Sequence, residues 1–76
     1  MKQITLDRPF TYQIRVPGQL DESWLEWNRE MRITFDNDPP VTTLTAAMDQ
    51  ASLQGLLRRL YSLGIPVISV ECLEYK

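Results

Sequence analysis

Histidine is absent from the chain and cysteine occurs once, which excludes several familiar catalytic and metal sites. Without histidine, neither a Cys–His nor a Ser–His–Asp nucleophile can be built, and a zinc site lacks its usual ligands. The single cysteine, Cys72, cannot form an intrachain disulfide and is interpreted as a small core residue of an apolar strand. We therefore expect no metal, no cofactor and no enzyme, although chemistry by Asp, Glu, Tyr or Arg side chains is left open.

Long apolar runs and an excess of basic residues are also missing. No run approaches the roughly 18 residues that a membrane span needs, and the first ten residues lack the apolar core of a secretory signal. Eight Lys and Arg residues stand against ten Asp and Glu residues, for a net charge of −2, so phosphate attraction is weak. The composition predicts a soluble, cytoplasmic protein without a membrane or nucleic-acid partner.

The chain has 76 residues, which corresponds to one domain over residues 1–76. A domain of this size buries only about 60% of its unfolded surface, and oligomerisation is a common way to enlarge such a core. Residues 1–9 are expected either to form a loosely ordered N-terminal segment or to lengthen the first strand, with Pro9 favouring a break.

Four segments have the alternating pattern of strands. The first is predicted over residues 10–16, where Pro17 and Gly18 follow and end it. The second and third, over residues 31–36 and 41–48, are separated by a turn short enough for a hairpin. The last is predicted over residues 67–75, with its core side made by Ile68, Val70 and Cys72.

A short helix is predicted over residues 21–30, with Asp21 as its N-cap. Trp24 and Trp27 lie on its apolar stripe, which favours a core role over a ligand-stacking pair. Because the helix is short, one of the two rings is expected at the rim of the core.

The segment from residue 49 to residue 66 has the clearest helix signals. Asp49 is predicted to be the N-cap, and Met48 and Leu53 to form a hydrophobic staple. Gly64 suits the left-handed position that ends a helix, and Pro66 prevents its continuation. The expected buried stripe consists of Leu53, Leu56, Leu57, Leu60 and Leu63.

The resulting order is β-α-β-β-α-β. With right-handed crossovers, it predicts an α+β, ferredoxin-like split βαβ sandwich, in which two helices cover one face of a four-stranded antiparallel sheet. The fold hosts many functions. An acylphosphatase-like enzyme is disfavoured because the loop "VPGQLDES" has no arginine to hold phosphate, and an RNA-binding face is disfavoured because Thr11, Gln13 and Arg15 stand where bases would stack on aromatic rings.

The segments "YQIRVPGQLDESWLEW" and "TTLT…DQASLQGLLRRLYSLGIPVISVE" resemble a family of short, free-standing, uncharacterised bacterial proteins. Its members share an Ile-Arg-Val strand, a Gly-x-Leu turn, paired tryptophans and the pattern TTLTG…DQ…GLL…LG.P..SV. The likeness runs from about Tyr12 to Glu71. This chain departs from the pattern at Ala46, where members usually have Gly, and at Gln19, where they often have His. The resemblance implies a self-contained fold and no particular activity.

Two surfaces are predicted to make contacts. Gly55 lies nearly opposite the leucine stripe, on the outer face of the predicted helix. Its small size suits a shallow groove that another chain could contact. The alternative is that this face is solvated and merely tolerates a glycine. The open face of the sheet is the second surface, with Val41 and the last strand as its apolar part. The candidate interaction residues are Ala51, Gly55, Arg58, Arg59, Ser62, Leu73 and Tyr75.

No motif in the sequence identifies a particular function. We expect a non-catalytic protein-interaction or regulatory module that forms a homodimer or binds another protein. The alternative is a regulatory domain that senses a small molecule at a dimer interface, which would show as a ligand-dependent rise in melting temperature.

Overall fold

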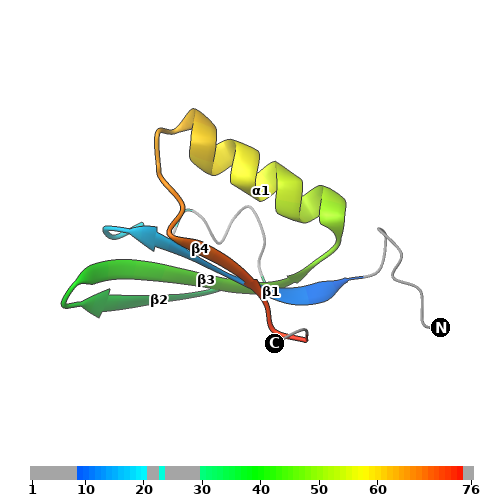
Figure 1. The fold of residues 1–76 in the computed structure, drawn as a ribbon, viewed down its shortest axis with the longest axis horizontal. Helices are drawn as coiled ribbons and strands as arrows, with labels where there is room; N and C mark the ends of the chain where they lie inside the picture. Colours follow the sequence, from blue (N-terminus) through cyan, green and yellow to red (C-terminus); the bar gives the residue numbers. More distant parts are fainter. Residues whose placement is uncertain (1–8, 21–22, 24–29, 75–76) are drawn as a thin grey trace.

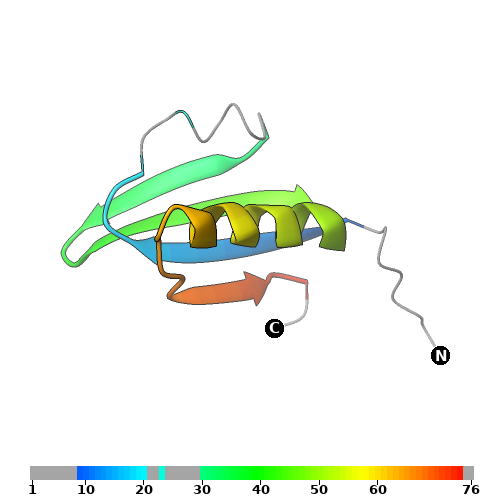
Figure 2. The same ribbon diagram turned by 90° about the horizontal axis from the view of Figure 1, so that it is seen from above.

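The computed structural model describes residues 9–20, 23 and 30–74. Four strands form one antiparallel sheet in the order β2-β3-β1-β4, with β1 spanning Phe10–Pro17, β2 Arg32–Asn37, β3 Pro40–Met48 and β4 Ser69–Cys72. Helix α1, Gln50–Ser62, lies across one face of this sheet (Figures 1 and 2). Because β3 and β4 both run antiparallel to β1, the β3-α1-β4 segment forms a split βαβ unit around β1.

The ferredoxin-like prediction is wrong. That fold needs two helices on one face of the sheet, whereas the described residues contain the single helix α1. The helix expected over residues 21–30 falls on a segment of which only Ser23 and Glu30 are described, and neither belongs to an α-helix. Trp24 and Trp27 lie outside the described residues, as do residues 1–8. The α+β class and the four-stranded antiparallel sheet are present.

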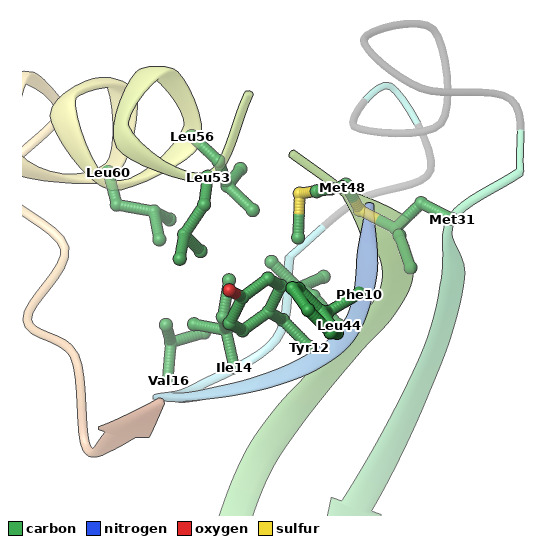
Figure 3. Close-up of a cluster of buried hydrophobic side chains, with 11 residues drawn as sticks. Phe10, Tyr12, Ile14, Val16, Met31, Leu44, Met48, Leu53, Leu56 and Leu60 are labelled. Carbon is green, nitrogen blue, oxygen red and sulfur yellow. The ribbon is translucent and has the colours of Figure 1, made fainter. Parts of the chain in front are cut away.

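The core lies between α1 and the sheet. The alternation predicted for β1 is confirmed, because its even-numbered residues are buried and pair with buried residues of β3 in the register Tyr12 with Ala46 and Ile14 with Leu44. Three leucines of α1 point into the same layer (Figure 3). The buried core residues of α1, β1 and β3 are Phe10, Tyr12, Ile14, Val16, Leu44, Ala46, Met48, Leu53, Leu56 and Leu60.

Both ends of α1 are fixed by the residues that the sequence indicates. The Asp49 carboxylate accepts a hydrogen bond from the Ser52 N–H at 2.7 Å, which confirms it as the N-cap. At the other end Gly64 has φ +74°, the Gly64 N–H donates to the Tyr61 carbonyl at 3.0 Å, and the Ile65 N–H donates to the Leu60 carbonyl at 2.9 Å. These two bonds are those of a Schellman motif.

We expect Gly64→Ala to lower the free energy of unfolding by about 1–2 kcal/mol, because the left-handed conformation is costly for any residue with a Cβ. Nothing lies within 4 Å of the position that the added Cβ would take, so the loss reports backbone conformation alone. Urea unfolding of both proteins measures it. Equal midpoints would show that the helix does not need a left-handed residue here.

Two predicted boundaries are wrong. The last strand, Ser69–Cys72, is four residues long and starts two residues later than expected, because residues 65–68 belong to the connection from α1. It also ends earlier than expected, because residues 73 and 74 form a turn. Leu63, predicted in the buried stripe, is 58% exposed. Leu63 is the C-cap, the residue that follows the last residue of α1, so it lies past the end of the buried stripe.

Candidate interaction surface

The outer face of α1 is accessible along its length. Gly55 is half-buried, and the Ser62 hydroxyl donates to the Arg59 carbonyl at 2.9 Å, so this hydroxyl is already used within the helix. The other predicted residues of this face, Ala51, Arg58, Arg59 and Ser62, are exposed. α1 therefore brings together the five residues that the sequence assigns to it, and whether they contact a partner stays a prediction.

The open face of the sheet is polar in the described strands. Arg15 of β1 faces Thr43 of β3 on one side and Ser69 of β4 on the other. One row further along the strands, Gln13 has Thr45 and Glu71 as its neighbours. This arrangement is typical of an antiparallel sheet with one solvated face.

The apolar patch expected on that open face is not found in the described residues. Val41, predicted as an exposed member, is buried at 6% exposure. Leu73 is half-buried, and Tyr75 lies outside the described residues. The apolar surface of this protein has to be sought elsewhere.

A different surface holds the large exposed hydrophobic side chains of the described residues. All of them fall within residues 61–70, where α1 ends, the chain crosses to the sheet and β4 begins. The two figures show these segments next to one another at the C-terminal end of α1 (Figures 1 and 2). This apolar cluster consists of Tyr61 (85% exposed), Leu63 (58%), Val67 (40%), Ile68 (52%) and Val70 (43%).

The cluster is exposed because of how the chain leaves α1. The Schellman turn at Gly64 directs Ile65 back onto the core, where it packs as a partly buried residue. The next three residues then cross to β4 without regular structure, and the Ile68 N–H bonds to the Arg15 carbonyl at 2.7 Å. Val70 faces the α1 side of the sheet, opposite Ile14, but it lies on an edge strand that nothing in the described chain covers. The five exposed side chains therefore belong to one segment of the chain at one margin of the core.

β4 is the sheet edge beside this cluster. All four of its residues, Ser69 to Cys72, pair with β1. No other described strand lies on its far side. Such an edge presents backbone N–H and C=O groups that another strand can bond.

Glu74 closes the far end of the β1–β4 pair. The Leu73 N–H donates to the Thr11 carbonyl at 2.9 Å, and both carboxylate oxygens of Glu74 accept from the Thr11 N–H at 3.0 Å. The Cys72 thiol also donates to the Glu74 Oε2 at 3.9 Å. The Glu74 carboxylate thus accepts the Thr11 N–H in place of a backbone carbonyl, and β4 ends at Cys72.

The Thr11 N–H bond lowers the pKa of the Glu74 carboxyl from its ordinary value of 4.5. Because the folded pKa is the lower one, this contribution to stability is fully present above about pH 4.5 and is lost as the pH falls through the folded pKa. We expect the stability difference between the wild type and Glu74→Gln to be constant from pH 7 to pH 5 and to shrink below pH 4.5. Chemical unfolding at each pH measures it, and a difference that persists unchanged at pH 2 would contradict the assignment.

Metal and membrane sites can be tested only within the described part of the chain. No three His, Cys, Asp or Glu residues in it are grouped so that they could hold a metal ion. No described helix has the length and apolarity to cross a membrane. The expectations of no metal, no enzyme activity and a cytoplasmic location stay predictions.

The sequence prediction misses this cluster because it places Leu63, Ile68 and Val70 on the core side, whereas all three are exposed. The segment "IPVISV" does carry a signal: its Val67, Ile68 and Val70 do not all fall on one side of a strand, so alternation cannot bury all three.

A family model described as a domain of unknown function, DUF8691, matches residues 11–71. This match is consistent with the expected resemblance to an uncharacterised family, while bacterial membership and the sequence pattern stay predictions. No curated protein and no solved structure matches. With most of its length covered by that model, the chain belongs to the family of the DUF8691 domain of unknown function.

Proposed function

We propose that this protein is a small, non-catalytic protein-interaction module that self-associates through the apolar cluster at residues 61–70. The observation that carries the proposal is the concentration of exposed hydrophobic side chains in one ten-residue segment. Scattered exposed hydrophobic residues need no explanation, but a group of them in one place marks a contact surface.

The size of the domain supports the same conclusion. A chain of 76 residues has a small core, and leaving Tyr61 and Leu63 in water forgoes hydrophobic stabilisation that a contact would provide. In a contact between two identical surfaces, the patch of one copy is buried against the patch of the other, so both patches leave water at once.

Leu63→Lys is the variant that tests this proposal. Leu63 is 58% exposed at the C-cap of α1, and a cation is favourable at that end of a helix, so folding is not at risk. We expect the wild type to show a mass that rises toward that of a dimer across a concentration series by light scattering. Leu63→Lys should shift this transition to at least about tenfold higher concentration, since it places a charge in an apolar contact.

The matched control is Ala51→Lys, which adds the same charge to an exposed position of the same helix outside the cluster. It should leave the transition unchanged. A wild type that is monomeric at every concentration would contradict the proposal. So would an association that Ala51→Lys weakens and Leu63→Lys does not, because the outer face of α1 would then be the contact surface.

A further inference from the structure

Within the described residues, no strand pairs with the outer edge of β4. Residues of an antiparallel strand alternate in the direction of their N–H and C=O groups. Because the Leu73 N–H bonds to Thr11 of β1, the groups of Glu71 and Ser69 also point toward β1. The groups of Val70 and Cys72 therefore point away from β1, to the outer edge of the sheet.

We propose that this edge pairs with β4 of a second copy of the chain, antiparallel and with Val70 at the twofold axis, so that two four-stranded sheets join into one. The inference rests on the self-association proposed above and adds its geometry: which strand meets which, and in what register.

Two antiparallel registers bring the outward groups of Val70 to a partner strand, and charge separates them. Centring the pair on Val70 places Val70 opposite the partner's Val70 and Ser69 opposite the partner's Glu71. Shifting the centre to Glu71 places two carboxylates directly opposite one another, and like charges in that position are destabilising. The pattern of β4 thus favours the register centred on Val70.

The apolar cluster fits the same arrangement. Val70 and Cys72 lie on the α1 side of the sheet, opposite Ile14 and Tyr12. A twofold axis perpendicular to the sheet brings the α1 sides of both copies to the same side of the joint. In the register centred on Val70, the Val70 side chains of the two copies meet on this side of the joint, and the exposed ends of both helices flank it.

Charge complementarity on the open face is the second argument. Arg15 is exposed and lies beside Ser69, the small residue of that row. In the proposed register the next residue of the row is the partner's Glu71, two strand spacings or about 10 Å from Arg15 between Cα atoms. Extended arginine and glutamate side chains can meet across a serine at that separation, and the symmetry makes this ion pair twice.

A charge-swap experiment tests the pairing. Arg15→Glu and Glu71→Arg should each weaken dimerisation by about tenfold or more, because like charges then face one another across the joint. The double variant Arg15→Glu/Glu71→Arg should restore most of the affinity. Sedimentation equilibrium gives the dissociation constants, and thermal unfolding of each variant under monomeric conditions separates effects on folding.

Arg32→Glu is the matched control, since Arg32 lies exposed on the same face but on β2, at the opposite edge of the sheet. It should leave the dissociation constant within about twofold of the wild type, as expected for a distant charge screened by salt.

Cysteine crosslinking tests the register. In a hydrogen-bonded antiparallel pair the Cα atoms are about 5.5 Å apart, which a disulfide can span. Val70→Cys/Cys72→Ser places the introduced thiols of the two copies opposite one another at the twofold axis and should give a covalent dimer under mild oxidation, whereas the wild type, whose Cys72 does not face the partner's Cys72 in this register, should not.

The outcomes separate this inference from the proposed function. If Leu63→Lys weakens association, but Arg15→Glu/Glu71→Arg does not restore the affinity lost in its two single variants and Val70→Cys/Cys72→Ser does not crosslink, the cluster is a contact surface and the β4 pairing is wrong. If the wild type does not associate at all, both are wrong. Rescue by the double variant together with the specific crosslink establishes the pairing.

Discussion

Leu56→Ala is expected to lower the free energy of unfolding by about 2–5 kcal/mol, the range for removing a fully buried leucine side chain. Leu56 has no exposed surface and lies in the middle of the layer between α1 and the strands β1 and β3 (Figure 3). A 76-residue domain has a total stability of about 4–11 kcal/mol. The loss is therefore a large share of the whole, and the variant should unfold at a much lower urea concentration than the wild type.

Urea unfolding followed by far-UV circular dichroism measures this loss. Leu63→Ala is the matched control, because it makes the same chemical change on the same segment at a position that is 58% exposed. Its cost under monomeric conditions should stay below about 1 kcal/mol. Equal losses at the two positions would contradict the assignment of Leu56 to the core and Leu63 to the surface.

Thr42→Val is the second variant with a large expected effect. Thr42 is fully buried, and its hydroxyl donates to the Gly18 carbonyl at 2.6 Å and accepts from the Leu20 N–H at 3.2 Å. Valine keeps the shape but leaves both backbone groups without this partner. Since an unsatisfied buried polar group costs about 1–3 kcal/mol, we expect a loss in that range.

Thr43→Val supplies the comparison for Thr42→Val. Thr43 is the next residue of β3, points to the open face and is half-buried. The same substitution there should change stability by less than about 0.5 kcal/mol. If both variants unfold at the same urea concentration, the hydroxyl of Thr42 does not hold the chain that follows β1.

Local signals in the sequence were sufficient for most of the sheet and for α1. Alternation locates β1, β2 and β3 to within one residue at each end, because their buried and exposed sides differ clearly. Asp49 and Gly64 mark the ends of α1 through bonds to the backbone nearby. Such contacts depend on residues close in sequence, so their effect can be derived without the fold.

The length of β4 could not be derived in this way. The end of β4 is set by Glu74, whose side chain bonds the N–H of Thr11, 63 residues away. Its start is set by the connection from α1, in which the Ile68 N–H already bonds to β1 before the ladder begins. Long-range contacts of this kind leave no periodic trace in the sequence.

The candidate interaction surface was likewise predicted only where local spacing determines it. The five predicted residues of α1 share its outer face, as helical spacing requires. The apolar cluster was not predicted, because Leu63 was placed by extending the helical period one residue past the end of the helix. Val70 was placed by strand alternation, which gives the correct side of the sheet but not its exposure at an edge.

Hydrogen exchange of the unmodified protein at low and high concentration tests the central claim most directly. If the cluster at residues 61–70 is the contact surface, amide exchange in residues 61–72 should slow as the concentration rises, with the outward amides of Val70 and Cys72 changing most. Exchange in residues 51–59 and in β2 should stay constant. Exchange that is independent of concentration throughout, or that slows only in residues 51–59, would contradict self-association through this surface.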